Sequence, residues 1–293
     1  MKNQFLTKLT FAAFILIASG FRFSGFSQKK SDNSLPAGSV KLEYNYPAEK
    51  SFKYVADSKI VETMDVNGQS MLVNVSMFLG CDVKSAGREG DNLKLEIKID
   101  SIAQFVDSPN GAMGGSVNDV KGKTFNVIIS PAGKTEDMTE ANNIVYTVEG
   151  SGESSMAQAF MNFFPALPKG VVKTGDTWTT NDTIDSKTST MSMWMPVASD
   201  CKFEGIEKVD GIDCARISAT LSGDRKMTTQ SQGMEIHTSG TFTGTQVLLF
   251  AVKEGYFIQD SVSSKMTGII DIPDQGMSFP VVMDITSINK VVK

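Results

Sequence analysis

Residues 52–83 read FKYVADSKIVETMDVNGQSMLVNVSMFLGCDV, and this stretch decides the fold of the chain. It contains two runs in which apolar and polar residues alternate, separated by Asn67-Gly68, a dipeptide typical of two-residue hairpin turns. Pairing outward from that turn gives Val66 with Gln69, Met64 with Met71, Ile60 with Val75, Ala56 with Leu79, Tyr54 with Cys81 and Phe52 with Val83. These residues all fall on one face, where Ser58 and Glu62 are the exceptions. A slip of one residue would turn the whole apolar set to the other face, so the turn and the burial pattern select the same register.

A second long hairpin is predicted at the end of the chain. With residues 273–276 as a four-residue loop, the pairs are Ile272 with Met277, Ile270 with Phe279, Gly268 with Val281, Met266 with Met283 and Ser264 with Ile285. Further runs predict strands at 93–99, 125–129, 191–196, 201–208, 212–221 and 242–252, with a bulge near Asp100-Ser101. Strands of about 15 residues exceed the common length of about 3–10 and should twist and curve. The sequence therefore predicts a mainly β protein with a long curved antiparallel sheet, half-barrel-like or an open sandwich.

One amphipathic helix is predicted at residues 155–164. Ser155 and Gln158 have the spacing of a capping box, Phe160 and Phe163 recur at helical spacing, and Pro165 ends the run. The apolar stripe of this helix should pack on the sheet. We expect a single β-rich domain over residues 39–293, made of two halves (39–150 and 165–293) that the helix joins.

The N-terminus has the order of a secretory signal. Lys2 and Lys8 precede an apolar run of about 13 residues, and small residues follow it, which predicts a signal peptide over residues 1–27. Residues 28–38 read as a flexible lead-in. The apolar run is shorter than the roughly 20 residues that a membrane-spanning helix needs. Because no cysteine lies near the cleavage site, we expect a protein of the periplasm or the extracellular space that is not a lipoprotein.

The charge of the chain argues against nucleic acid as a partner. Removal of residues 1–27 deletes three basic residues and no acid, which takes the formal charge from −5 to −8. No basic cluster remains to bind an anionic membrane surface, because the other lysines are scattered among acidic residues.

The three cysteines are Cys81, Cys201 and Cys214. A three-residue loop at 209–211 would pair Lys208 with Ile212 and Cys201 with Ala219, and would place Cys214 on the opposite face. A two-residue loop keeps the sulfurs far apart along the strands. In either arrangement no disulfide joins Cys201 to Cys214, since bridged Cα atoms lie within about 7 Å of each other. We interpret the cysteines as small apolar core residues.

No catalytic or metal-binding pattern stands out. His237 is the single histidine, which excludes a two-histidine zinc site and leaves one Cys-His pair as the only nucleophile of that kind. The 33 acidic residues fall mostly in turns or on polar strand faces, although a carboxylate pair for glycoside hydrolysis stays open. No glycine-rich phosphate motif opens a helix. We therefore predict no catalytic residue, no metal and no cofactor.

Sixteen methionines, several on the predicted apolar faces, suggest a surface that adapts to apolar ligands. The other interpretation is ordinary core filling. We predict that Met193, Trp194 and Met195 form one dense apolar patch within this set. The ligand-lining candidates are Met64, Met71, Met77, Phe160, Phe163, Trp178, Met193, Trp194, Met266 and Met283.

Two strings carry a resemblance to a known family. They are GKTF at 122–125 running on to ISPAGK at 129–134, and FPALP at 164–168 followed by GDTW at 175–178. With the FSQ at the end of the signal, they resemble an uncharacterised family of exported Bacteroidota proteins, a domain of unknown function that spans the mature chain. The predicted architecture is also similar to the half-barrel of periplasmic lipoprotein carriers, which hold acyl chains in their concavity. Those carriers are typically shorter and lack the GDTW string, and neither resemblance implies a catalytic residue.

These features favour a non-enzymatic envelope protein that binds a lipid or another apolar molecule in a concave sheet. The alternative is a structural or interaction module of the envelope with a filled core and a protein partner. A carboxylate-type hydrolase is the third reading.

Overall fold

The computed structural model describes residues 38–66, 68–109, 111–148, 152–187, 191–231 and 233–292. The predicted signal peptide (1–27), nearly all of the lead-in and Asn67 lie outside the described residues.

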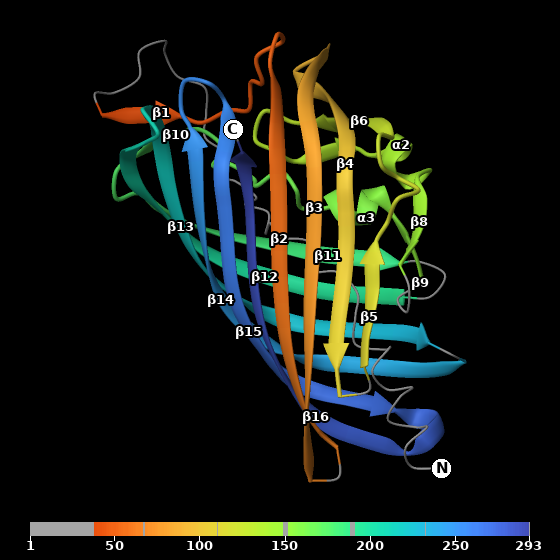
Figure 1. The fold of residues 1–293 in the computed structure, drawn as a ribbon. Coiled ribbons are helices and arrows are strands. Elements are labelled where there is room, and N and C mark those ends of the chain that lie inside the picture. The colour runs from red at the N-terminus through yellow and green to blue at the C-terminus, as the bar shows by residue number, and fades with distance from the viewer. Residues whose placement is uncertain are drawn as a thin grey trace.

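The molecule is built on one antiparallel sheet of 12 strands that does not close on itself (Figure 1). Its order is β11 (Thr177–Lys187), β12 (Met191–Val209), β13 (Ile212–Ser231), β14 (Met234–Ala251), β15 (Tyr256–Ile272), β16 (Met277–Val292), β2 (Ser51–Val66), β3 (Gln69–Glu89), β4 (Asn92–Ser108), β6 (Thr124–Ile129) and β7 (Thr135–Asp137), with β5 (Gly111–Ser116) also paired to β4. Because β16 pairs with β2, the last strand of the chain lies beside the first long hairpin. The two parts of the sequence thereby share one sheet.

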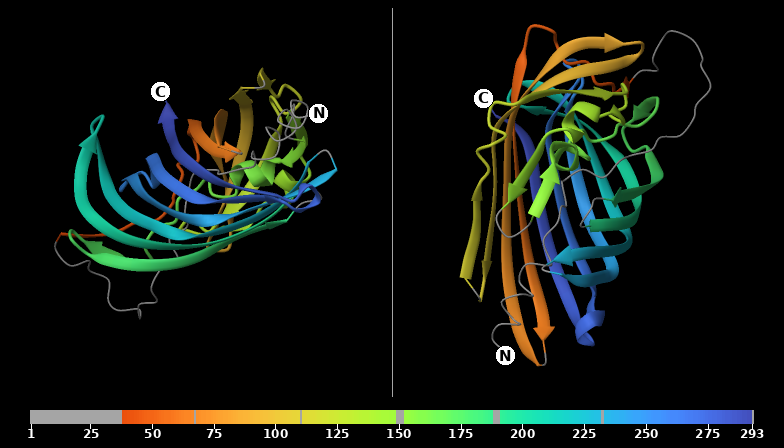
Figure 2. Two further views of the ribbon diagram at one scale, coloured as in Figure 1. Left: turned by 90° about the horizontal axis from the view of Figure 1, so that it is seen from below. Right: turned by 90° about the vertical axis from the view of Figure 1, so that its right-hand side faces the viewer.

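Smaller elements complete the described structure. They are the pair β1 (Ser39–Lys41) with β10 (Val171–Lys173), the pair β8 (Val145–Val148) with β9 (Gly152–Ser155), and the helices α2 (Thr139–Asn142), α3 (Met156–Phe160) and η1 (Pro273–Gln275). Figure 2 shows the large sheet bent into a trough, with α2 and α3 on its concave side.

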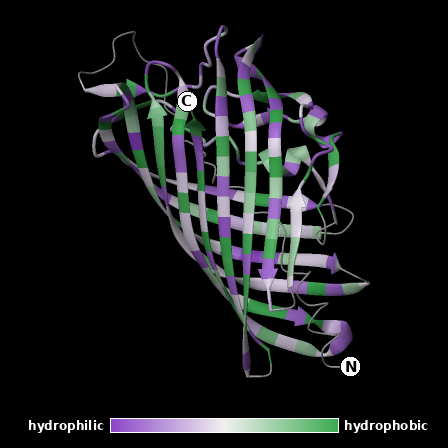
Figure 3. Ribbon diagram, viewed as in Figure 1, coloured by the Kyte–Doolittle hydropathy of each residue, from purple (hydrophilic) through white to green (hydrophobic). Residues whose placement is uncertain are grey.

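The predicted register of both long hairpins is confirmed. All six pairs of the first hairpin and all five pairs of the last one are cross-strand partners in the structure. Along these strands hydrophobic and hydrophilic residues alternate, as the bands of Figure 3 show. The predicted bulge after residue 99 is also present, because Gly80 pairs with Ser101 while Cys81 pairs with Ile99. Turn chemistry and burial therefore fix the register wherever both act on the same strands.

The hairpin turn between Cys201 and Cys214 has two residues rather than the three of the first predicted arrangement. Val209 pairs with Ile212 across a two-residue turn, in which Asp210 and Gly211 have φ angles of 52° and 84°. Positive φ at both positions is the geometry of a type I′ turn. A bulge between Phe203 and Gly205 then shifts the register, so Cys201 pairs with Ala219 as predicted. Lys208 pairs with Asp213 rather than Ile212.

The predicted helix at 155–164 is wrong in its length. The capping box between Ser155 and Gln158 is present, but α3 ends at Phe160. Residues 162–168 are all buried and run as turn and irregular chain. A helix lying on a sheet buries only one face, whereas an extended segment between two layers can bury every side chain. The concave side thus carries two short helices instead of one long one.

The two strings that carry the family resemblance contact each other. Leu167 donates its backbone N–H to the carbonyl of Ala132 over 2.8 Å, and the Tyr44 hydroxyl donates to the carbonyl of Pro165 over 2.7 Å. A Cβ atom added to Gly133, whose φ is 84°, would lie 2.6 Å from that Pro165 oxygen. Glycine is therefore required where this turn approaches the 164–168 loop.

The GDTW string forms a turn and the start of a strand. The Asp176 carboxylate accepts a hydrogen bond from the Lys173 backbone N–H over 2.8 Å, and Gly175 donates to the carbonyl of Phe203 over 2.8 Å. Strand β11 begins at Thr177, directly after Asp176. This string anchors the edge of the sheet.

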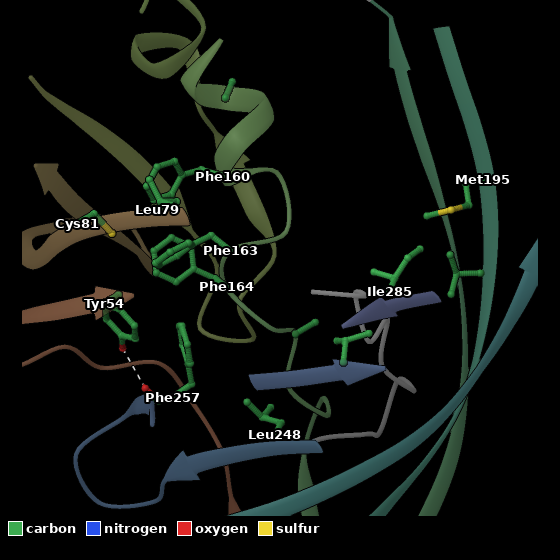
Figure 4. Packing of buried hydrophobic residues seen from close by; sticks show 14 of the residues in the cluster. Tyr54, Leu79, Cys81, Phe160, Phe163, Phe164, Met195, Leu248, Phe257 and Ile285 are labelled. Atoms are coloured by element: carbon green, nitrogen blue, oxygen red, sulfur yellow. Dashed lines mark hydrogen bonds between the residues drawn. The ribbon is translucent and has the colours of Figure 1, made fainter. Parts of the chain in front are cut away.

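Aromatic side chains fill the space between the short helices and one end of the sheet. We call this group the aromatic core; it consists of Tyr44, Tyr46, Phe52, Tyr54, Phe125, Phe160, Phe163, Phe164, Phe250, Tyr256 and Phe257. Phe163 packs against Phe160 and Tyr54 at ring centroid distances of 4.7 and 5.5 Å (Figure 4). The Tyr54 hydroxyl lies 2.8 Å from that of Tyr46 and donates to the carbonyl of Phe257 over 3.0 Å. The buried polar atoms of these tyrosines are thus hydrogen-bonded.

Candidate functional site

The concave face changes its chemistry along the length of the strands. On β2 the inward positions pass from Tyr54, in the aromatic core, through Ser58 to Glu62 and Met64. The neighbouring β16 passes in the same direction through Asn289, Ser287 and Met283. An aromatic end, a polar middle and a methionine-rich end therefore follow one another on the same face.

The polar middle is mostly joined by hydrogen bonds. Ser58 and Ser287 face each other across β2 and β16 with their hydroxyls 2.7 Å apart. Gln246 donates to the Asp260 carboxyl over 2.7 Å, and Asn289 donates to the carbonyl of Phe163 over 3.3 Å. Burial raises the pKa of Asp260 to about 7, although the hydrogen bond from Gln246 opposes the shift.

Beyond this layer lies a group that we call the methionine region. Its members share the concave face and are buried, and they are Glu62, Met64, Met71, Met193, Arg225, Met227, Met266 and Met283. Met64 pairs with Met71 across β2 and β3, and Met266 pairs with Met283 across β15 and β16. Met227 belongs to a small cluster with Met193 and Met191.

Arg225 lies in the centre of the methionine region, where only 3% of its surface is exposed. Its terminal nitrogens contact sulfur atoms: Nη2 is 3.1 Å from Met227, and Nη1 is 3.8 Å from Met283 and 3.9 Å from Met266. Nε has no partner. Thioethers are weak acceptors, so they do not replace the hydration that a guanidinium loses on burial. Burial lowers the pKa of Arg225, with Glu62 opposing the shift, but an arginine side chain stays charged in proteins.

Glu62 faces the same region from β2, opposite Met283. Only 1% of its surface is exposed, and neither carboxyl oxygen has a hydrogen-bond partner in the described part of the chain. Across the residues that the structure describes, no ion pair joins Glu62 to Arg225. Burial raises the pKa of Glu62 to about 8, and the charge of Arg225 opposes part of this shift. The region thus combines a fixed positive charge with a carboxyl group that is largely neutral at pH 7.

The register explains how Arg225 reaches so far across the sheet. Its cross-strand partner on β14 is Gly240, and Gly240 pairs in turn with Gly268 on β15. Neither glycine has a side chain to block the guanidinium, which extends from β13 to the sulfur atoms of Met266 and Met283 on β15 and β16. Chemically, this arrangement can bind an apolar chain along the thioethers and an anionic group at the arginine.

The structure divides the ten predicted ligand-lining residues among several places. Met64, Met71, Met193, Met266 and Met283 lie in the methionine region. Phe160 and Phe163 lie in the aromatic core, in contact with other rings. Met77 and Trp178 are half-buried against the main core.

Trp194 does not share a face with its neighbours. Met193 and Met195 are buried, whereas Trp194 is 43% exposed and has the Lys226 ammonium 5.6 Å from its ring centroid. The prediction of one dense patch at 193–195 is therefore wrong, because successive side chains of a strand point to opposite faces.

The sequence reasoning missed the two charged residues of the region. Glu62 stands out only as an exception on an apolar face, and Arg225 lies beyond the predicted end of its strand at residue 221. Continuing the alternation of Ile217, Ala219 and Leu221 places Arg225 and Met227 inward. A charged residue at an inward position of a long strand is the signal that could have found it.

A separate groove of about 580 Å³ lies between α3 and β11. Gln158, Asn162, Asp182 and Ile184 are among the residues that line it. Polar and apolar side chains mix in this groove, and none of the ten predicted ligand-lining residues contributes to it. It is therefore not the apolar surface that the sequence predicts.

The thiols and the histidine lie apart from one another. Cys81, Cys201 and Cys214 are free and buried, and burial raises the pKa of each thiol. His237 donates or accepts at Thr228 over 3.1 Å and lies 2.8 Å from a Glu235 oxygen. In the described part of the chain, no group of three or more His, Cys, Asp or Glu residues could hold a metal ion. The helices described there are also too short or too polar to span a membrane.

No protein-family model matches the sequence, and no curated protein matches it significantly. Three solved structures show a distant likeness. Neisserial surface protein A (NspA) is 7% identical with a TM-score of 0.22 and coverage of 83% of this chain and 100% of its own. Pseudomonas aeruginosa OpdQ is 8% identical with a TM-score of 0.25 and coverage of 83% and 99%. A DUF1329 family protein from Desulfovibrio piger is 11% identical with a TM-score of 0.14 and coverage of 81% and 85%. At these TM-scores the likeness carries no argument about function.

Proposed function

We propose that this protein is an exported, non-catalytic envelope protein that binds a lipid or another amphiphile on the concave face of its sheet. The signal-like residues 1–27 support export. The observation that carries the binding proposal is the burial of Arg225 and Glu62 among methionine side chains: within the described residues, Arg225 contacts only sulfur atoms and the Glu62 carboxyl has no hydrogen-bond partner. Buried polar atoms in a finished core have partners, as those of the aromatic core do.

The methionine side chains support the same proposal. Each has flexible torsions and a polarisable sulfur, so a group of them can repack around apolar chains of different shape. Met64, Met71, Met266 and Met283 come from four strands that pair side by side, and they offer a continuous apolar surface. A hydrocarbon chain that lies along this surface would displace flexible methionine side chains and would not need to move rigid aromatic rings.

A second candidate is a structural or interaction module with a filled interior. The low exposure of the methionine region and the dense ring packing of the aromatic core favour it. In that case Arg225 and Glu62 would specify the packing of the sheet, and the protein would act through a protein partner.

The two candidates separate in a purification from the native host. The protein is extracted under mild conditions, its fold is checked by circular dichroism, and bound molecules are identified by lipid mass spectrometry. We expect an amphiphile near one equivalent per chain. The substitution Met266→Asn should reduce its amount, whereas Phe105→Ala, at a position that is 52% exposed, should leave it unchanged. A folded protein without any amphiphile, but with a stable partner after crosslinking, would favour the second candidate.

A further inference from the structure

We infer that Arg225 binds the anionic head group of an amphiphile, a terminal carboxylate or phosphate, while its hydrocarbon chain lies along the methionine region. This inference rests on the proposed function and adds the chemical class of the ligand. It also assigns a specificity role to a residue outside the predicted ligand-lining set.

The bonding of Arg225 supports this assignment. A guanidinium presents its donors in a planar fork that matches carboxylate and phosphate oxygens. Within the residues that the structure describes, the Nε donor of Arg225 has no partner, and its terminal nitrogens reach only the sulfurs of Met227, Met266 and Met283. An anionic oxygen would replace weak acceptors with strong ones. The burial of the side chain strengthens this attraction, because little water screens it.

Glu62 does not neutralise Arg225. The two residues face the same region from β2 and β13, which three strands separate in the sheet, and no ion pair joins them within the described structure. Because burial raises the pKa of Glu62 to about 8, its carboxyl group is largely protonated at pH 7. A protonated carboxyl can donate a hydrogen bond to the same head group. The other buried acid on this face, Asp260, lies toward the aromatic core and is held by Gln246.

Gly240 and Gly268, which follow Arg225 in register across the sheet, leave room for the buried guanidinium on the concave face. Gly240 and Gly268 are half-buried partners, and a Cβ atom on Gly240 would lie 2.9 Å from the Met266 methyl group. A side chain at Gly240 would therefore crowd the Met266 methyl group. The absence of side chains at both glycines allows a head group to approach the guanidinium while the chain follows the methionines.

The test compares ligands that share one chain and differ in the head group. Dodecanoate, dodecyl phosphate and dodecanol are titrated into the delipidated protein at pH 7 by isothermal titration calorimetry. We expect at least one anionic ligand to bind about 10-fold or more tightly than dodecanol, the margin of a charge-assisted hydrogen bond. The anion that binds more tightly distinguishes a carboxylate from a phosphate head group.

Variants assign the preference to Arg225. Arg225→Met should abolish it while dodecanol binding remains. Arg216→Met is the matched control, because Arg216 lies on the same strand, is half-buried and is ion-paired with Glu207 over 3.3 Å. Equal affinity of the wild type for all three ligands would overturn the inference and leave the proposed function standing. Failure of the wild type to bind any of them would overturn both. The comparison of ligands on the wild type needs no variant, so it can overturn the inference even if Arg225→Met does not fold.

Discussion

The aromatic core and the methionine region lie on the same concave face but differ in how their buried polar groups are paired. In the aromatic core the hydroxyls of Tyr44, Tyr46 and Tyr54 all have hydrogen-bond partners. The rings pack with centroid separations as short as 4.2 Å. In the methionine region the Glu62 carboxyl and the Nε atom of Arg225 have no hydrogen-bond partner among the described residues. The same alternating strands therefore support a finished packing at one end and an incompletely paired surface at the other.

From this difference we expect the aromatic core to contribute mainly to stability and the methionine region mainly to ligand binding. Rigid rings with satisfied polar groups specify one arrangement, whereas flexible thioethers tolerate several. The polar layer of Ser58, Ser287, Gln246 and Asp260 lies between the two. We expect substitutions at the aromatic end to change mainly unfolding, and substitutions at the other end to change mainly ligand binding.

The largest effect is expected for Phe163→Ala. Its ring contacts Tyr54, Phe160, Phe164 and Phe257, so its removal leaves a cavity and should lower the free energy of unfolding by about 3–5 kcal/mol. Denaturant unfolding followed by circular dichroism measures this loss. Phe105→Ala, on an exposed ring, should change stability by no more than about 0.5 kcal/mol. Equal losses for both variants would contradict a packed aromatic end.

The pH dependence of stability tests Glu62. Its pKa is about 8 in the folded protein against a usual value of 4.5, so the folded state holds this proton more tightly. Stability should therefore fall as the pH rises from about 5 to 8, by on the order of 2–4 kcal/mol. Asp260, with a pKa of about 7, contributes in the same direction.

Glu62→Gln should flatten this pH profile, because the amide does not titrate. Glu96→Gln is the control, since Glu96 is half-buried on β4 and paired with Lys84 over 2.8 Å. Unfolding curves measured at several pH values give the pH dependence of stability for both variants. An unchanged slope in Glu62→Gln would show that the Glu62 carboxyl is not buried.

The ligand-free protein should tolerate Arg225→Met. Replacing an unpaired buried charge by an apolar side chain of similar length removes a desolvation cost, so stability should stay the same or rise by about 1–3 kcal/mol. Thermal unfolding at pH 6, where Glu62 is protonated, measures the change. A large loss would mean that the guanidinium has strong acceptors in the folded protein.

The smallest effect is expected for Trp194→Ala. This ring is exposed and contacts Lys226, a cation–π interaction that contributes about 0.5–1 kcal/mol. Stability should fall by no more than that amount, and ligand affinity should not change. A loss of ligand binding in this variant would place the site on the opposite face of the sheet.

The sequence predicts the strand register better than the chemistry of the site. The pairings of Met64 with Met71 and of Met266 with Met283 follow from turns and alternation, which are local signals. The placement of Glu62 and Arg225 in one region depends on the pairing of β16 with β2 and on the curvature of the sheet. No local sequence pattern encodes either feature. The length of α3 is set by tertiary burial of residues 162–168, which overrides helical spacing. Apolar composition alone groups Trp194 with Met193 and Met195, but the alternation of side chains along a strand turns its ring to the opposite face.

Photo-crosslinking tests the central claim most directly. A dodecanoate analogue with a diazirine in its chain is bound to the delipidated protein, irradiated, and located by peptide mass spectrometry. Adducts should fall on the inward residues of β2, β15 and β16 within the methionine region, and excess dodecanoate should suppress them. Adducts confined to the aromatic core or to the outer face, or the absence of any specific adduct, would contradict binding in this region.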